Sequence, residues 1–171
     1  MTKLFFYAIA LVLFIFSCKA PEQKHATKLD NAWLNGIIKN SDSSYTKPYY
    51  RTDFVTASYY INKKDSSTCQ LMKDSAGIVR QIIIVTKNVR TFFGQYYPNG
   101  QLLAWLPLDE FGQYHGDATF YYQDSTVQSN GAYQHGLKQG RWKNYDEKGT
   151  LISTEEYDEN GQLTRASKHN N

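Results

Sequence analysis

Apolar and polar residues alternate over several segments of the chain. From Leu151 to Tyr157, odd-numbered and even-numbered side chains would face opposite sides, because successive side chains of a strand point to opposite faces. This period of two predicts a half-buried β-strand. Segments 53–61 and 78–87 are rich in Val, Ile, Thr or Tyr, and 67–73 lies between them with polar turns on both sides, so all three are predicted strands. The apolar run Ile82–Val85 predicts a strand that is buried on both faces.

One short helix is predicted before these strands. It covers residues 29–39, and Asp30 is placed to act as its N-cap. Its single apolar stripe contains Trp33, Leu34, Ile37 and Ile38. The helix is interpreted either as a plug at one end of a sheet or as an amphipathic segment lying on a membrane. Stacked-repeat proteins need terminal caps, which favours the plug. Residues 41–48 are predicted to form a loop.

A longer pattern repeats in the second half of the chain. Residues 131–153 read GxYxxGxxxGxWxxYxxxGxLxS. Shifts of 24 residues (112 to 136) and 49 residues (93 to 142) superimpose parts of two earlier units on this one. The framework positions are Phe93, Tyr96, Gly100, Gly112, Gly116, Tyr121, Tyr133, Gly136, Gly140, Trp142, Tyr145, Gly149, Tyr157 and Gly161. A period of this length predicts units that stack, because none can bury its own apolar face.

Each unit contains a hairpin signal. Segments 97–100 (YPNG), 146–149 (DEKG) and 158–161 (DENG) predict type I turns closed by a left-handed glycine. Ser125 takes the glycine position in the middle unit, where a left-handed residue other than glycine costs about 1 kcal/mol. Pro107 cannot donate to a ladder, so its strand is predicted to be an edge or to be interrupted. The predicted fold is mostly β: an antiparallel meander of β-hairpins forming an elongated open sheet, capped by one short N-terminal helix.

The repeated residues resemble the bacterial variant of the MORN repeat, whose units read approximately GxYxxGxxxGxWxxYxxxGxL. The resemblance covers residues 91 to about 163. It implies stacked hairpins in an elongated, twisted, open sheet, and it transfers no catalytic residue because the motif contains none. Proteins with such repeats are often labelled antitoxin components of toxin–antitoxin systems. The repeated aromatic residues are interpreted as stacking positions; the alternative is an exposed aromatic ribbon that recognises a ligand.

The N-terminal residues predict export. Lys3 precedes the charge-free apolar run 4–16, which is shorter than the about 20 residues that span a bilayer. The sequence ending at Cys18 (Ile-Phe-Ser-Cys) resembles a lipobox, which implies cleavage before Cys18 and lipidation of its thiol. An ordinary secretory signal and an uncleaved N-terminal helix remain as alternatives. The resemblance implies a membrane-anchored lipoprotein of the cell envelope that faces the periplasm or the cell surface.

The chain is therefore expected to have five parts. They are a lipoprotein signal peptide (1–17), a flexible tether (18–28), a cap helix with a β-meander (29–90), the MORN-variant repeats (91–165) and a disordered tail (166–171). Removing residues 1–17 leaves 154 residues (171 minus 17), enough for one domain.

Charge and cysteine content narrow the function classes. The mature chain carries 18 basic residues (19 minus Lys3) and 16 acidic residues without a basic block, which argues against nucleic-acid binding. If Cys18 is lipidated, Cys69 is the remaining thiol. It is predicted to be a small buried hydrophobic residue, because no histidine or helix start lies near it to activate a thiolate.

No local catalytic motif is found in the sequence. The histidines are His25, His115, His135 and His169, and none of them is spaced from another like a metal-ligand pair on a helix or strand. Glu155 and Glu156 would point to opposite faces of a strand and cannot act as a carboxylate pair. We therefore predict no catalytic residue, no metal and no cofactor. The expected function is a non-enzymatic protein-binding or scaffold module with an unknown protein partner; an antitoxin or immunity protein, or an envelope hydrolase, are the alternatives.

Overall fold

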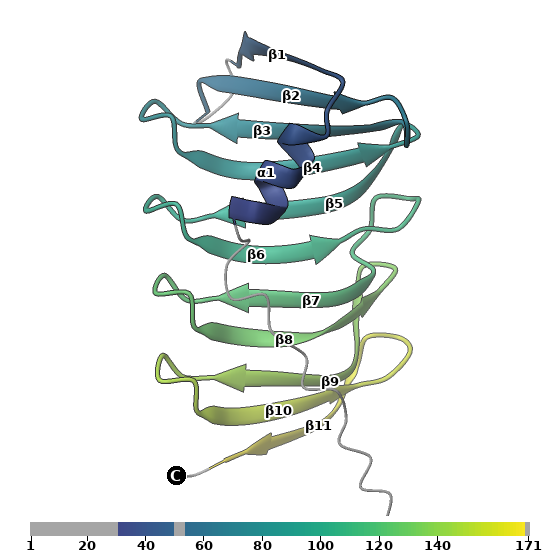
Figure 1. Cartoon of the computed structure of the whole chain (residues 1–171). Coiled ribbons are helices and arrows are strands. Elements are labelled where there is room, and N and C mark those ends of the chain that lie inside the picture. Colours follow the sequence, from purple (N-terminus) through teal and green to yellow (C-terminus); the bar gives the residue numbers. More distant parts are fainter. Residues whose placement is uncertain (1–30, 50–53, 170–171) are drawn as a thin grey trace, which may run out of the picture.

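A computed structural model describes residues 31–49 and 54–169. These residues form one helix and one antiparallel sheet of eleven strands, in which every strand pairs with its neighbours in the sequence (Figure 1). The elements are α1 (Asn31–Lys39), β1 (Ser43–Pro48), β2 (Thr56–Asn62), β3 (Ser67–Lys73), β4 (Val79–Thr86), β5 (Val89–Tyr96), β6 (Leu102–Pro107), β7 (Gly116–Tyr121), β8 (Val127–Gln134), β9 (Leu137–Tyr145), β10 (Leu151–Tyr157) and β11 (Leu163–Lys168). The predicted fold class, an open antiparallel meander with a short N-terminal helix, is confirmed.

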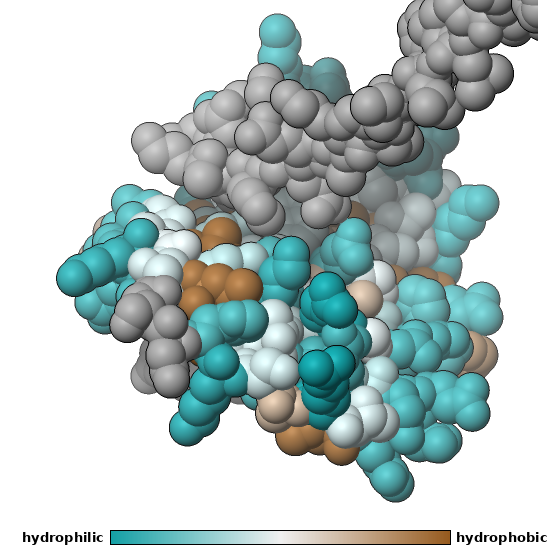
Figure 2. All heavy atoms as spheres, turned by 90° about the horizontal axis from the view of Figure 1, so that it is seen from below, coloured by the Kyte–Doolittle hydropathy of each residue, from teal (hydrophilic) through white to brown (hydrophobic). Residues whose placement is uncertain are grey.

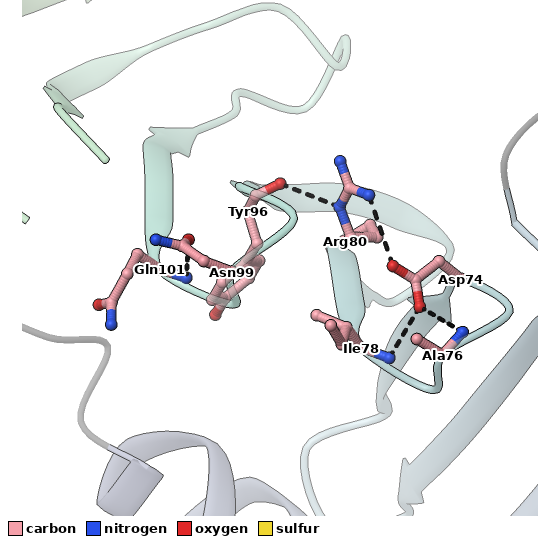
Figure 3. Close-up of polar contacts among 7 residues, drawn as sticks. All are labelled: Asp74, Ala76, Ile78, Arg80, Tyr96, Asn99 and Gln101. Carbon is pink, nitrogen blue, oxygen red and sulfur yellow. Dashed lines mark hydrogen bonds and ion pairs between the residues drawn. The ribbon is translucent and has the colours of Figure 1, made fainter. Parts of the chain in front are cut away.

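Five hairpin turns share one geometry, in which a side-chain oxygen accepts a hydrogen bond from the amide two residues later. At Asp146 the carboxylate Oδ1 accepts hydrogen bonds from the amides of Lys148 and Thr150 at 2.9 and 2.8 Å, and Gly149 then turns with φ +79°. The Asp74 carboxylate does the same for the amides of Ala76 and Ile78, as Figure 3 shows. Ser125 forms the equivalent turn with φ +75°, although it is not glycine. The side-chain acceptor and the left-handed residue together close each turn.

A β-bulge follows the turn in each of five hairpins. The paired register skips one residue on β4, β6, β8, β10 and β11. Bulges bend and twist a strand, so their regular placement repeats the same curvature from hairpin to hairpin. The ladder between β6 and β7 is short, with partners at Ala104 and Trp105, and β6 ends at Pro107. The predicted interruption at Pro107 is therefore confirmed.

The sheet has two faces, and α1 covers part of one of them. We call this side the helix face and the opposite side the reverse face. In Figure 1 the helix lies across β3–β5. Its apolar stripe packs on a core that includes Ile82, Phe92 and Leu102. Trp33 contacts Phe92 edge-on at a centroid distance of 5.7 Å. The helix therefore covers a sheet face, and the expectation that it plugs one end of the sheet is wrong.

Three local expectations need correction. The predicted loop 41–48 contains β1, where Tyr45 stacks on Tyr59 of β2 at 4.7 Å. The tail predicted to be disordered from residue 166 is ordered up to Lys168, because β11 pairs with β10. β1 and β11 are exposed edge strands, so their sequences lack the apolar alternation that predicts a strand. β4 was expected to be buried on both faces, but it is buried less than that. Ile82 is fully buried, whereas the neighbouring apolar residues on the opposite face are half-buried.

Candidate functional site

The helix face is open next to α1. No helix of the described ranges covers β7–β10 on this side, and a hollow of about 780 Å³ is lined by residues of β6–β9. The strand register aligns Trp105, Thr119, Asn130 and Lys143 in one row across four strands. With increasing distance from α1, these four side chains offer an aromatic ring, a hydroxyl, an amide and an ammonium group.

Charge is concentrated at the far side of this hollow. Arg141 donates from Nε to Oε1 of Glu156 at 2.6 Å, and its side chain remains 65% exposed. Lys143 is exposed and makes no ion pair with another described residue. Among the described lining residues, Asp117 is the one carboxylate. The hollow therefore offers hydrogen-bonding groups, an aromatic border and an excess of positive charge, without a carboxylate pair.

The reverse face buries Trp142, a framework aromatic residue of the last complete repeat. Trp142 is 1% exposed, lies against the backbone of Gly131 and donates from Nε1 to the carbonyl of Ala132 at 3.1 Å. Tyr133 packs edge-on against it at 5.0 Å. Trp142 therefore fits the stacking interpretation, since its ring is not free to contact a ligand.

Lys138 covers the aromatic pair of Trp142 and Tyr157. Its Nζ lies 4.5 Å and 5.0 Å from the two ring centroids. It also donates to Tyr157 Oη at 3.2 Å and to Glu155 Oε2 at 3.4 Å. Burial lowers the pKa of Lys138, but these two partners outweigh burial and raise it. The pKa of Glu155 is lowered chiefly by the hydrogen bond from the Tyr157 hydroxyl. This cluster is a packed ionic cap over the core.

Hydrogen bonds join hairpins at the spacing of the repeat. The Tyr97 hydroxyl donates to the Tyr121 carbonyl at 2.8 Å, and the Tyr122 hydroxyl donates to the Tyr145 carbonyl at 2.8 Å. Ser125 Oγ donates to Gln101 Oε1 at 2.7 Å across another 24 residues. These contacts were not predicted from the sequence, although Tyr pairs recur at 96–97 and 121–122.

Most framework glycines lie at turns or strand starts, and Gly140 lies inside β9 beside the irregular part of its pairing with β8. Those with a left-handed φ are Gly100, Gly112, Gly116, Gly136, Gly140, Gly149 and Gly161. Tyr96 and Tyr121 are buried, and burial raises the pKa of both. Cys69 is also buried as expected, and burial raises the pKa of its thiol to about 12, which removes the thiolate at neutral pH.

Cys18, the signal peptide and the tether lie outside the described residues. Within the described part of the chain, no helix is long and apolar enough to cross a bilayer. Figure 2, which views the sheet from its β11 end, shows a mostly hydrophilic surface with small apolar areas.

A cluster of metal-ligating side chains was not predicted from the sequence. Asp109, His115 and His135 come together at the edge of the sheet where β6–β7 and β8–β9 are connected. Asp109 Oδ2 lies 2.9 Å from His135 Nδ1. Partial burial raises the pKa of Asp109, but hydrogen bonds from the Gln113 amide and from His135 outweigh it, so the pKa is lowered.

Comparison with known proteins supports the repeat in one hairpin. The sequence profile of the MORN repeat variant matches residues 138–158, which span most of β9, the turn and β10. No curated protein sequence matches the chain. A chain in the "Crystal structure of accessory secretory protein 1,2 and 3 in Streptococcus pneumoniae" is similar with 17% identity and a TM-score of 0.36, over 56% of this chain and 18% of that chain.

Proposed function

We propose that this protein is a lipid-anchored envelope protein whose sheet acts as a non-enzymatic module for binding or scaffolding a protein partner. The open half of the helix face is the observation that supports this function best. There a row of aromatic, hydroxyl, amide and ammonium groups faces outward across β6–β9.

The shape and chemistry of this surface favour a macromolecular partner. Small-molecule sites enclose most of their ligand and are lined mainly by apolar groups. This hollow is instead open and as polar as it is apolar, and its two basic groups lie on β9, at the side away from α1. Aromatic residues and arginine are enriched in protein interfaces, and Trp105, Tyr145 and Arg141 supply both here. The partner is expected to present acidic groups opposite Lys143 and Arg141.

Affinity capture from envelope extracts tests this function. The wild-type chain is expected to retain a protein partner after crosslinking, and Lys143→Glu is expected to lose it because the charge at the hollow is reversed. Lys64→Glu is the matched control, since Lys64 is an exposed lysine in the turn between β2 and β3, on another part of the sheet. Capture that is equal for both variants would place the interface elsewhere.

The lipid anchor requires its own experiment. Cells are labelled with a fatty-acid analogue, and the label on the wild-type chain is compared with that on Cys18→Ala. Label is expected on the wild type and absent from the variant, because the thiol is the acceptor. Equal labelling of both chains would remove the anchor from the proposed function.

The match to the MORN repeat variant keeps an antitoxin or immunity role as the second candidate. In that case the partner held by the open face would be a toxin. Co-expression of this chain with a toxin from a neighbouring gene is expected to restore the growth of cells that produce the toxin, and only when the hollow is intact. An envelope hydrolase receives less support, since the described lining residues include one carboxylate where glycoside hydrolysis commonly uses two.

A further inference from the structure

The three residues of the Asp109 cluster come from two connections that the antiparallel topology places at one edge. Asp109 opens the turn after β6, His115 immediately precedes β7, and His135 lies between β8 and β9. The amide of Gly136 donates to the Tyr114 carbonyl at 2.8 Å, which joins the two connections beside the histidines. Residues that are separated by 20 and 26 positions in the sequence are therefore neighbours in space.

Backbone amides of its own turn hold the carboxylate of Asp109 in place, independently of the histidines. Its Oδ1 accepts hydrogen bonds from the amides of Phe111 and Gln113, both at 2.9 Å. This orients Oδ2 toward His135 Nδ1, and the Asp109 side chain is 9% exposed. Hydrogen bonds that orient a carboxylate in this way are typical of the outer shell of a metal site.

The spacing of the possible ligand atoms suits a metal ion. One ligand atom from each of the three residues lies within 4.8 Å of the other two. Zinc binds imidazole nitrogen and carboxylate oxygen at about 2.0–2.2 Å, so two ligands of a tetrahedral ion are about 3.4 Å apart. Asp109 Oδ2 and His135 Nδ1 lie 2.9 Å apart, slightly closer than this. The His115 ring, whose centroid lies 5.0 Å from that of His135, supplies the third ligand atom.

We propose that Asp109, His115 and His135 form a binding site for a divalent transition-metal ion such as zinc. Two imidazoles and one carboxylate are a ligand set that zinc uses, and water would complete its coordination because both histidines are exposed. The ion would clamp the β6–β7 connection to the β8–β9 turn. This site is separate from the hollow on the helix face and does not depend on the proposed function.

Metal titration of the full chain tests the site. The protein is purified in detergent with a tag that contains no histidine, stripped with EDTA, and titrated with zinc by calorimetry and with cobalt by visible absorption. One ion per chain is expected. Substitution of orienting residues around metal sites commonly weakens binding by about 10–100-fold, so loss of a ligand in His115→Ala, His135→Ala or Asp109→Asn is expected to cost at least about tenfold.

Two variants serve as matched controls. Asp146→Asn changes an aspartate that holds an equivalent turn through the amides of Lys148 and Thr150, and His169→Ala removes an exposed histidine at the end of β11. Both are expected to bind zinc like the wild type. Far-UV circular dichroism of the same samples shows that each variant is folded. The proposal is overturned if the wild type binds no ion, or if the two cluster-histidine variants bind as well as the wild type, as they would if Asp109 and His135 formed only an ion pair.

Discussion

Gly131 and Trp142 show how single residues determine the packing of the repeat. A Cβ atom at Gly131 would clash with ring atoms of Trp142, closer than real side chains approach one another. The ring is 1% exposed and is held by its hydrogen bond to Ala132. Glycine at this position therefore allows the indole to lie flat against the backbone.

Gly131→Ala is expected to lower the free energy of unfolding by about 1–3 kcal/mol, because the added methyl group overpacks the reverse face. Gly36→Ala is the control, since Gly36 lies in α1 and no atom lies within 4 Å of the place that an alanine methyl group would take there. That variant is expected to gain up to about 1 kcal/mol from helix propensity. Urea unfolding of both measures the difference, and equal stability of the two variants would contradict the packing described.

The carboxylates in the turns make the stability of the folded protein depend on pH. Hydrogen bonds, led by that from the Thr150 amide, lower the pKa of Asp146 below its ordinary value of 3.8. A carboxyl whose pKa is lower in the folded state contributes stability above its unfolded pKa. That stability is lost as the pH falls through the folded pKa.

Acid is therefore expected to destabilise the wild type partly through these turns. Asp146→Asn keeps an oxygen acceptor for the amides but has no proton to bind. The variant should consequently lose less stability than the wild type between about pH 5 and pH 2. Urea midpoints measured across this range provide the comparison. Parallel curves for the two proteins would show that Asp146 does not contribute to the acid response.

At the scale of the element, the hairpin is the unit that repeats. Five hairpins combine an aspartate or asparagine acceptor in the turn, a left-handed residue and a bulge in the following strand. Tyrosine hydroxyls then link one hairpin to the backbone of the next. The period of 24 residues has a physical basis in these contacts as well as in the stacked rings.

Tyr97→Phe and Tyr122→Phe are each expected to lower the free energy of unfolding by about 0.5–1.5 kcal/mol, because each removes one hydrogen bond between hairpins. Tyr45→Phe is the control, since the Tyr45 ring stacks on Tyr59 while its hydroxyl bonds to no described residue. Chemical denaturation checks all three. Losses at Tyr97 and Tyr122 no larger than that at Tyr45 would refute the role of these links.

The hairpins could be predicted from sequence because their turns carry chemical signals. Glycine after Asp-x-x or Pro-Asn predicted 97–100, 146–149 and 158–161 correctly. The edge strands β1 and β11 could not be recognised, since exposed strands have no apolar face to alternate. The amphipathic helix was recognised, but its stripe does not state which face of the sheet it covers.

The candidate sites were harder to predict than the fold. The hollow depends on which strands the helix leaves open, and that information is absent from local patterns. His115 and His135 lie 20 residues apart, four short of the repeat period, so their meeting depends on the lengths of two connections. Spacing rules for helices and strands do not cover ligands brought together by stacked turns.

The whole molecule is an open sheet with two protected edges and one partly covered face. Lys47 and Pro48 end the exposed β1, and Arg165 and Lys168 are exposed on β11. Charges and proline at edge strands oppose association with further strands. Figure 1 shows α1 over the N-terminal half of the helix face, so the C-terminal half is where a partner has access to an extended surface.

Site-specific photo-crosslinking in living cells tests the central claim, that a protein partner occupies the open half of the helix face. A photoreactive amino acid replaces Lys143 in the hollow or, as a control, Lys64 in the turn between β2 and β3. Illumination is expected to give one adduct of defined mass from position 143 and none from position 64. No adduct at position 143, or equal adducts at both positions, would contradict the account.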